Sequence, residues 1–253
     1  MLRKFLRTRA AVNPPAPAIP AGERVYAIGD VHGRLDLLDQ LLAAIDADDA
    51  ARDPARTIIV LLGDLVDRGP DSAGVVERVR RLRDERADVR LLLGNHEEVF
   101  LAALEGDPKA LRLFCRIGGR ETALSYGISA DDYEVMGYSE LAEALRCLVP
   151  EAHRALLAGA SDMETIGDYA FVHAGVHPAR PLDDQRVTDL RWIRDPFLDH
   201  RGRLARMIVH GHTITEEVES RAHRIGIDTG AYASGRLSAL GLQAIRNWQL
   251  RTG

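Results

Sequence analysis

Three short apolar runs near the start of the chain each end in a glycine that is followed directly by a polar side chain. The runs and their ends are Val25–Ile28 with Gly29-Asp30, Ile58–Leu62 with Gly63-Asp64, and Val89–Leu93 with Gly94-Asn95. Short apolar runs bounded by turn residues are typical of buried strands. Because apolar residues recur at helical spacing between the runs, the pattern predicts strand–helix–strand units with right-handed crossovers and a largely parallel sheet.

The remainder of the chain predicts a second sheet and a helical insertion. Residues 105–160 show no strand pattern, and we expect short helices there, on one rim of the domain. Ser72 is expected to cap the helix that precedes the third run. Later strands are expected at about 164–166, 169–173, 207–210, 222–227, 237–240 and 243–247. The simplest fold is one α/β (α+β) domain over residues 23–253 with two stacked β-sheets.

Residues 1–22 are expected to form a flexible tail, because they combine four basic residues with a proline-rich stretch. The tail lacks the apolar core of a secretory signal, and no apolar run reaches the length that a membrane helix requires. Cys115 and Cys147 form no CxxC pair, which is typical of a reducing compartment. We therefore expect a cytoplasmic protein without a membrane partner.

The charge of the chain excludes one broad class of function. Its 253 residues carry 33 basic and 38 acidic side chains, which gives a formal net charge of −5. Proteins that bind nucleic acid through bulk positive charge have the opposite balance. No nucleic-acid partner is expected.

The polar residues that end the first three strands are expected to meet, because parallel strands bring their carboxyl ends to one edge of a sheet. Two later strands also end in histidines, at His173 and His212. Buried carboxylates and imidazoles are costly unless they are paired or bound to a metal ion. Cations therefore explain best a cluster that consists of Asp30, His32, Asp64, Asn95, His173 and His212.

This mixed set of carboxylate, amide and imidazole ligands suits manganese, iron or zinc better than calcium. Six ligands are too many for one tetrahedral ion, whereas they suit two divalent or transition metal ions that share a bridging carboxylate. Manganese is the expected metal, with iron and zinc as alternatives.

The polar segments resemble those of the calcineurin-like metallophosphoesterase superfamily, and more narrowly those of bacterial and phage serine/threonine protein phosphatases of the PPP family. The resemblance covers about residues 24–247, and its segments are Gly29–Arg34, Gly63–Ser72, Leu93–Glu97, His173–Gly175 and Gly211–Thr213. It implies a fold of two mixed sheets that pack together and are flanked by helices. A further segment, Gly118-Gly119-Arg120 with Thr122, resembles a stretch that faces the site in bacterial members, and no role is assigned to it.

The resemblance implies a role for each metal ligand. Asp64 would bridge the two ions, with Asp30 and His32 on the first ion and Asn95, His173 and His212 on the second.

The resemblance also implies the catalytic residues. His96 would be the general acid and Asp67 would orient it, while Arg68 would grip the phosphate. A second phosphate-binding arginine is expected in a Trp-x-Arg segment, here Trp192-Ile193-Arg194, which makes Arg194 the candidate.

The implied function is a metal-dependent phosphomonoester hydrolase, specifically a phosphoprotein phosphatase that acts on phosphoserine or phosphothreonine. Two cations would lower the pKa of a bridging water, and the resulting hydroxide would attack phosphorus in line with the leaving oxygen. His96 directly follows the ligand Asn95, so it could protonate the leaving oxygen without binding metal. The expected partner is a phosphorylated protein or a small phosphoester.

Two other functions stay open. A symmetrical dinucleoside tetraphosphate hydrolase would share the metal site, although Asp67 and Glu97 follow the protein-phosphatase pattern and that family typically departs from it at both positions. A non-catalytic module that binds phosphorylated partners would have lost a metal ligand or the acid, and none is lost here.

Overall fold

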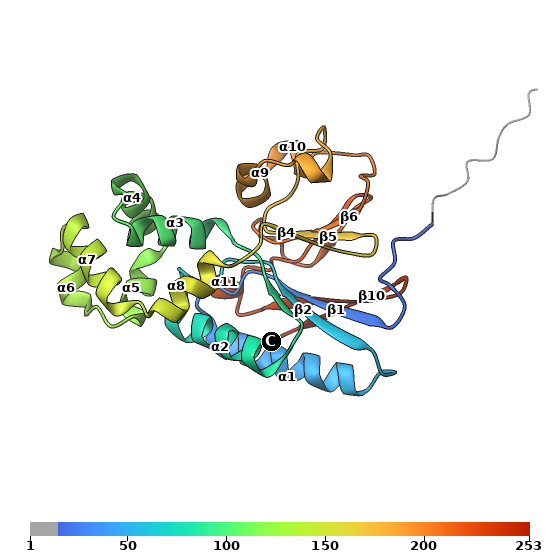
Figure 1. Ribbon diagram of the computed structural model, residues 1–253, viewed down its shortest axis with the longest axis horizontal. Helices are drawn as coiled ribbons and strands as arrows, with labels where there is room; N and C mark the ends of the chain where they lie inside the picture. The colour runs from blue at the N-terminus through green and yellow to red at the C-terminus, as the bar shows by residue number, and fades with distance from the viewer. Residues whose placement is uncertain (1–14) are drawn as a thin grey trace, which may run out of the picture.

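The computed structural model describes residues 15–253 as two five-stranded β-sheets with helices on their outer faces and at one end (Figure 1). The first sheet has the strand order β10-β9-β1-β2-β3 and the second has the order β4-β5-β6-β8-β7. The strands are β1 (Glu23–Ile28), β2 (Arg56–Leu61), β3 (Val89–Leu91), β4 (Met163–Ile166), β5 (Tyr169–Val172), β6 (Met207–His210), β7 (Glu219–Ser220), β8 (Arg224–Gly226), β9 (Ser238–Gln243) and β10 (Arg246–Arg251).

Both sheets are mixed. In the first, β1, β2 and β3 run parallel, whereas β9 runs antiparallel to β1 and to β10. In the second, β5, β6 and β8 run parallel, and β4 and β7 are antiparallel to their neighbours. The predicted fold of two stacked mixed sheets flanked by helices is therefore confirmed.

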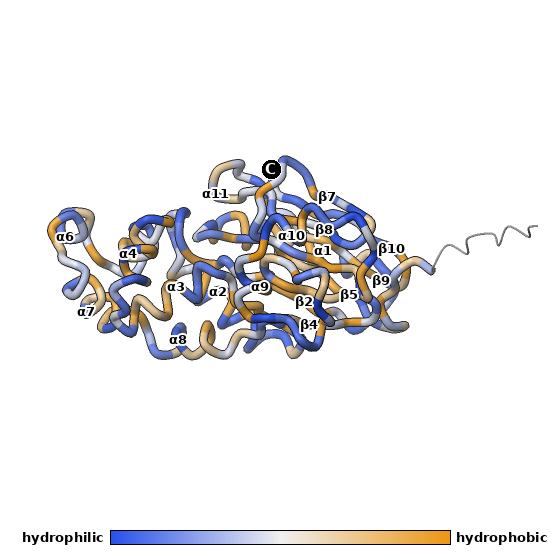
Figure 2. The backbone as a smooth tube through the Cα atoms, turned by 90° about the horizontal axis from the view of Figure 1, so that it is seen from above, coloured by the Kyte–Doolittle hydropathy of each residue, from blue (hydrophilic) through white to orange (hydrophobic). Residues whose placement is uncertain are grey.

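The helices cover the outer faces and extend to one side of the sheets. They are α1 (Leu35–Ala50), α2 (Ser72–Glu85), α3 (Asn95–Leu104), α4 (Pro108–Ile117), α5 (Gly119–Ser125), α6 (Ala130–Val135), α7 (Tyr138–Leu148), α8 (Glu151–Ala158), α9 (Val187–Trp192), α10 (Asp195–Leu198) and α11 (Ala231–Ser234). Seen from above, α4, α6 and α7 lie well away from the sheets (Figure 2). Among the described residues, no helix has both the length and the apolar character that crossing a membrane takes.

The core is layered because successive side chains of a strand point to opposite faces of its sheet. On β1, Val25 and Ala27 face the second sheet and pack in a cluster with Phe171 of β5. Tyr26 and Ile28 point the other way, into the cluster that α1 and α2 complete. The outer face of the second sheet packs in turn against α9 and α10.

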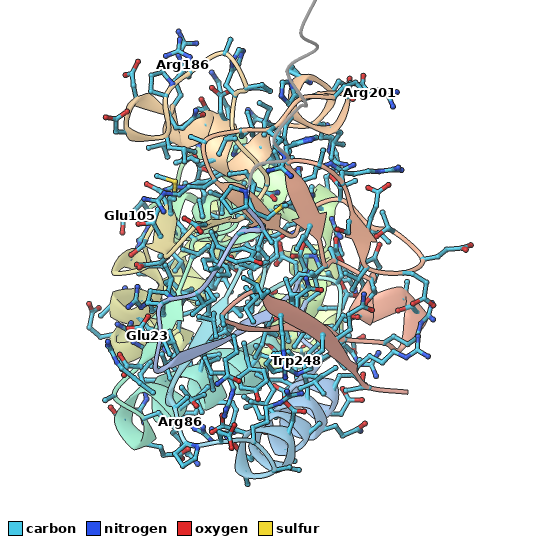
Figure 3. All side chains as sticks on the ribbon, turned by 90° about the vertical axis from the view of Figure 1, so that its right-hand side faces the viewer. Glu23, Arg86, Glu105, Arg186, Arg201 and Trp248 are labelled. Atoms are coloured by element: carbon cyan, nitrogen blue, oxygen red, sulfur yellow. The ribbon has the colours of Figure 1, made fainter. Side chains whose placement is uncertain are left out.

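Labelled side chains mark the two outer helical layers of the molecule. Arg186 and Arg201 mark the side of the molecule that α9 and α10 cover, and Arg86 at the end of α2 marks the opposite side (Figure 3). The two sheets lie between these helical layers.

Three local expectations are wrong. The strand expected at 243–247 is interrupted by a turn at 244–245, because Ala244 has a φ of 48° and separates β9 from β10. The strand expected at 222–227 begins only at Arg224, since Arg221 N–H donates to the Arg224 carbonyl at 2.8 Å and closes a turn. Asp71 rather than Ser72 caps α2, because its carboxylate accepts the Gly74 N–H at 2.8 Å.

The first 14 residues of the expected tail lie outside the described residues. In the part that is described, the Ala18 N–H donates to the Asp168 carboxylate at 3.0 Å. Ile19 is buried, and its N–H donates to the Ala244 carbonyl at 2.9 Å. The chain therefore contacts both sheets before β1 begins.

Candidate metal centre

Unusual backbone geometry collects in the loops that follow the strands. Among residues 15–253, six non-glycine residues have a positive φ, and five of them are predicted site residues, namely His32, Asp64, Asp67, Arg68 and His212. Residues with a side chain avoid this left-handed region. Such strain persists where the surrounding structure holds it in place, which is common at functional sites.

Asp64 follows β2 and lies between two groups of histidines. Its Oδ1 is 3.4 Å from Nε2 of His173, and its Oδ2 is 3.6 Å from Nε2 of His32. The ligand atoms of His32, Asp64 and His96 lie within 4.8 Å of one another, and so do those of Asp64, His173 and His212. Asp64 alone belongs to both clusters, which is the position that a bridging carboxylate requires.

Lone pairs converge beside Asp64. The Nδ1–H of His173 donates to the Leu62 carbonyl at 2.8 Å, so its Nε2 carries the lone pair. That Nε2 lies 3.0 Å from Oδ1 of Asn95, which also lies 2.8 Å from Nδ1 of His212. Two acceptors at this distance repel each other, and a cation between them turns the repulsion into attraction.

Asp30 and His32 follow β1 on the other side of Asp64. The Nδ1–H of His32 donates to the Val66 carbonyl at 2.8 Å, which again leaves the lone pair on Nε2. Oδ2 of Asp30 accepts the His212 N–H at 2.9 Å. Its Oδ1 is buried and has no hydrogen-bond partner, although Asp30 belongs to neither tight cluster.

These residues fit a pair of divalent metal ions. Asp64 has one oxygen on each side, the lone pairs of two imidazoles face it, and a buried Asp30 oxygen lacks a donor. Gly211 packs directly against that Asp30 oxygen, where a side chain at position 211 would collide with it. A buried carboxylate oxygen without a partner is costly, and a metal ion removes that cost.

His96 lies beside this centre and is tied to Asp67. Its Nδ1 is 2.7 Å from Oδ2 of Asp67, and both side chains are buried. Arg68 donates from Nη2 to Nε2 of His96 at 3.0 Å, and from Nη1 to Nε2 of His32 at 3.1 Å. The proton of His96 therefore sits on Nδ1 in this arrangement, and the Nε2 atom faces Arg68 and, at 3.9 Å, Oδ2 of Asp64.

Arg194 lies at the rim of the site. It is exposed, and its Nη2 donates to the His212 carbonyl at 3.4 Å. The structure thus brings all ten predicted site residues to one edge of the two sheets, with Arg194 as the outermost. Their individual roles stay predictions.

Burial and neighbouring charges separate the pKa values of the site. Burial lowers the pKa of His32 and of His212 to about 3, so both imidazoles are neutral and able to bind metal. Burial also lowers the pKa of His96, but Asp64 and Asp67 outweigh it and raise that pKa above its usual value. Burial likewise raises the pKa of the Asp64 carboxyl, but the histidines around it outweigh this and hold the pKa well below its usual range.

Two buried carboxylates belong to the site although the sequence did not assign them a role in it. Glu97 accepts the N–H groups of Asp64, Leu65, Val66 and Gly94 at 2.7 to 3.1 Å. Asp228 lies beside Asp30, and burial raises its pKa to about 6. Asp228 follows Ile227 and precedes a glycine two residues on, so the strand-end pattern that indicated the predicted ligands could also have indicated Asp228.

A carboxylate that lies between two groups of histidines could hold metal ions on both of its sides, as expected of a metallophosphoesterase. The family model of the calcineurin-like phosphoesterases matches residues 23–249. The chain therefore belongs to this family and is a hydrolase of the metallophosphoesterase type, a family that implies divalent metal ions.

Curated relatives share part of the sequence. A protein of Acidovorax sp. (strain JS42) named symmetrical bis(5'-nucleosyl)-tetraphosphatase is 37% identical over 154 residues, which are 61% of this chain and 44% of the relative. A protein of Klebsiella pneumoniae with the same name is 47% identical over 81 residues, 32% of this chain and 26% of the relative. The matched part thus spans less than half of these relatives. The predicted membership of the superfamily is confirmed, whereas the narrower resemblance to PPP-type protein phosphatases stays a prediction.

Solved structures share the fold at low identity. A structure described as a candidate diadenosine tetraphosphatase superposes with a TM-score of 0.60 at 22% identity, covering 94% of this chain and 99% of the other. A cold-active protein tyrosine phosphatase of a psychrophilic Shewanella species superposes with a TM-score of 0.57 at 19% identity, covering 93% and 82%. These similarities bear on the fold alone.

Proposed function

We propose that this protein is a metal-dependent hydrolase that cleaves a symmetrical dinucleoside tetraphosphate into two nucleoside diphosphates. The observation that carries the proposal is the 37% identity over 154 residues with a protein named for that activity. The same activity was the second interpretation of the sequence, after phosphoprotein phosphatase. The site residues suit cleavage of any phosphate ester or anhydride, so the similarity to these relatives is what supports placing this activity first.

The side chains of the site have distinct tasks in this proposal. Asp30, His32, Asp64, Asn95, His173 and His212 would hold two divalent ions, which activate water and neutralise phosphate charge when bound. Arg68 and Arg194 would bind the phosphate oxygens from the protein side, because guanidinium groups match phosphate in charge and geometry. His96 would protonate the leaving oxygen from Nε2, while Asp67 holds its Nδ1–H at 2.7 Å.

A phosphoserine or phosphothreonine phosphatase is the second candidate, and the pair formed by His96 and Asp67 supports it. A nucleoside diphosphate leaves as a stable anion, because a terminal phosphate has a second pKa of about 6. A serine alkoxide is a far stronger base and leaves only with a proton. The acid is therefore more valuable for a phosphoserine substrate, and in this chain Asp67 and Asp64 raise the pKa of His96.

A substrate panel tests the order of the two candidates. The full chain is incubated with Mn²⁺ and either diadenosine tetraphosphate, a phosphoserine peptide or a phosphothreonine peptide, and products are separated by chromatography. The proposal expects ADP as the sole nucleotide product and a kcat/KM at least tenfold above that for either peptide. An Asp64→Asn variant is the control, because it removes the shared metal ligand and should abolish every activity.

Other products would rank the candidates differently. ATP together with AMP would show asymmetrical cleavage and would contradict the first proposal. Release of phosphate from the peptides with no turnover of the dinucleotide would favour the phosphoprotein phosphatase. A protein that binds both metal ions and hydrolyses none of these compounds would support the non-catalytic binding module instead.

A further inference from the structure

The turn between α4 and α5 docks directly on the loop that carries Asp67 and Arg68. Gly118 has a φ of 115°, and its carbonyl accepts the Arg68 N–H at 3.0 Å. A side chain on Gly118 would come within 2.8 Å of the Arg68 backbone nitrogen. A glycine is therefore required at this position, by both its backbone conformation and the close approach.

Thr122 extends this contact to the carboxylate of Asp67. Thr122 is fully buried, and its Oγ1 lies 2.7 Å from Oδ1 of Asp67 and 2.8 Å from the Asp67 N–H. Ser72 also takes part, because its Oγ lies 2.9 Å from Oγ1 of Thr122 and 3.0 Å from the Asp67 N–H.

The directions of these hydrogen bonds follow from the chemistry of the groups. The Asp67 carboxylate can only accept, so the single hydroxyl proton of Thr122 is donated to Oδ1. The Thr122 oxygen then accepts from the Asp67 N–H and from the Ser72 hydroxyl. Both oxygens of Asp67 are thus engaged, Oδ1 by Thr122 and Oδ2 by Nδ1 of His96 at 2.7 Å.

We infer that Thr122 is a positioning residue for catalysis, which holds the Asp67 carboxylate so that it aims the Nε2 of His96 at the leaving oxygen. The inference rests on the proposed role of His96 as general acid. It assigns the helices between β3 and β4 a part in catalysis, because the residue that orients the acid comes from α5 and not from either sheet.

Leaving-group dependence tests this inference. The probes are p-nitrophenyl phosphate, which needs little protonation, and phenyl phosphate, whose leaving phenolate has a pKa of about 10 like that of tyrosine. Thr122→Val keeps the shape and removes the hydroxyl. We expect kcat for phenyl phosphate to fall roughly 10-fold to 100-fold with KM unchanged, since a displaced catalytic group costs up to about 10²-fold. The kcat for p-nitrophenyl phosphate should change by less than about 3-fold.

Two companion variants separate positioning from a structural role. Thr122→Ser keeps the hydroxyl and should restore most of the lost kcat. Ser125→Ala is the matched control on the same helix, because the Ser125 hydroxyl accepts the Ala73 N–H at 3.1 Å and does not contact Asp67. It should leave the ratio of the two kcat values unchanged. Melting temperature and metal content are measured for every variant. If Thr122→Val does not fold, Ser72→Ala replaces it and should show a smaller loss of kcat for phenyl phosphate of the same kind.

The outcomes distinguish this inference from the proposal that it rests on. If Thr122→Val lowers kcat equally for both probes, or if serine does not restore it, Thr122 is structural and the inference is wrong. If His96→Ala lowers kcat by the same factor for phenyl phosphate and for p-nitrophenyl phosphate, the general-acid assignment is wrong. The inference about Thr122 is then wrong as well. If His96→Ala loses more kcat for phenyl phosphate than for p-nitrophenyl phosphate and Thr122→Val does not, only the role of Thr122 is overturned.

Discussion

Backbone carbonyl groups set the state of the two histidines that flank Asp64. His32 and His173 each donate Nδ1–H to the backbone carbonyl of a residue near the end of β2, Val66 and Leu62 respectively. Each bond fixes the ring and leaves Nε2 facing Asp64 with a lone pair. A single strand end therefore presents both a carboxylate and the acceptors that orient its two imidazole neighbours.

Replacing His96 by Asn should separate acid catalysis from metal binding. His96→Asn removes the group that would donate to the leaving oxygen and keeps the adjacent predicted ligand Asn95 in place. We expect kcat for a substrate with a poor leaving group to fall by roughly 10² to 10⁴. Steady-state kinetics on phenyl phosphate measures the loss, and elemental analysis should find the metal content unchanged. Unaltered turnover of phenyl phosphate would contradict the assignment of His96.

His210 should make the protein less stable in acid. It is buried on β6 near Arg224, and burial lowers its pKa to about 3. In the unfolded chain His210 binds a proton near pH 6.5, whereas in the folded chain it does so only near pH 3. The contribution of the neutral, buried His210 to the free energy of unfolding is therefore fully present above pH 6.5 and is lost as the pH falls toward 3.

A variant isolates this contribution. Between about pH 6.5 and 5, the free energy of unfolding of the wild type should fall by about 2 kcal/mol more than that of His210→Gln, at about 1.4 kcal/mol per pH unit. Urea unfolding of both proteins with a chelator, at about pH 7.5 and pH 5, measures the difference. An equal loss in the two proteins would show that His210 does not carry the effect.

At the scale of elements, the N-terminus of α3 is joined to the loop after β2 by one side chain. Glu97 lies in the first turn of α3, and its two oxygens accept four backbone N–H groups from that loop and from Gly94. It holds the strained backbone at Asp64 in place. The site thus depends on how the helix and the strand end fit together, and not on the strands alone.

Glu97→Gln should destabilise the protein. Burial, followed by the nearby Asp64 charge, raises the pKa of Glu97 to about 7, so at about pH 8 its carboxylate is ionised and can accept all four hydrogen bonds. A glutamine would turn an NH₂ group toward backbone donors. We expect the free energy of unfolding to fall by about 2 to 3 kcal/mol, which is the usual contribution of hydrogen bonds to a charged group. Urea unfolding measures it.

The neighbouring residue provides the control for this prediction. Glu98→Gln changes the next position of the same helix, where the side chain is partly exposed and accepts from Trp192 Nε1 at 3.0 Å. Its cost should stay within about 0.5 kcal/mol. If both variants lost the same amount, the loop would not depend on the Glu97 carboxylate.

At the scale of the whole molecule, the two sheets contribute different halves of the centre. Asp30, Asp64 and Asn95 follow strands of the first sheet, whereas His173 and His212 follow strands of the second. The cluster of Asp64, His173 and His212 therefore forms only when the two sheets pack through the core that Val25 and Phe171 share. Metal binding and the packing of the sheets should be coupled.

Removing metal should lower the melting temperature. Ions that bind the folded chain and not the unfolded one stabilise it by about 2.7 kcal/mol at a concentration 100 times Kd. For a chain of this size that corresponds to a rise of roughly 5 to 10 °C. Calorimetry of the chelated protein, with and without added Mn²⁺, measures the shift. In Asp64→Asn the melting temperature should rise little or not at all on adding Mn²⁺. A rise equal to that of the wild type would mean that the ions bind elsewhere.

The strand-end residues were predictable from the sequence because local patterns determine them. Apolar runs of four or five residues specify buried strands, and the glycine after each run specifies the turn that places the next side chain at the sheet edge. This local information predicted the parallel strand units, the stacked sheets and residues that could hold metal ions, Asp64 and His173 among them. The boundary errors at 222–227 and 243–247 arose at turns, which lie just before β8 and between β9 and β10.

Only the tertiary structure decided which polar groups support the site. Ser72 fits a helix cap in the sequence, but Asp71 takes that place and frees the Ser72 hydroxyl for Thr122, which is 50 positions away. The contacts of Glu97 and of Thr122 likewise join segments that no local pattern relates. Side-chain periodicity reports which face of an element is buried, whereas the partner of a buried polar group depends on the packing of distant segments.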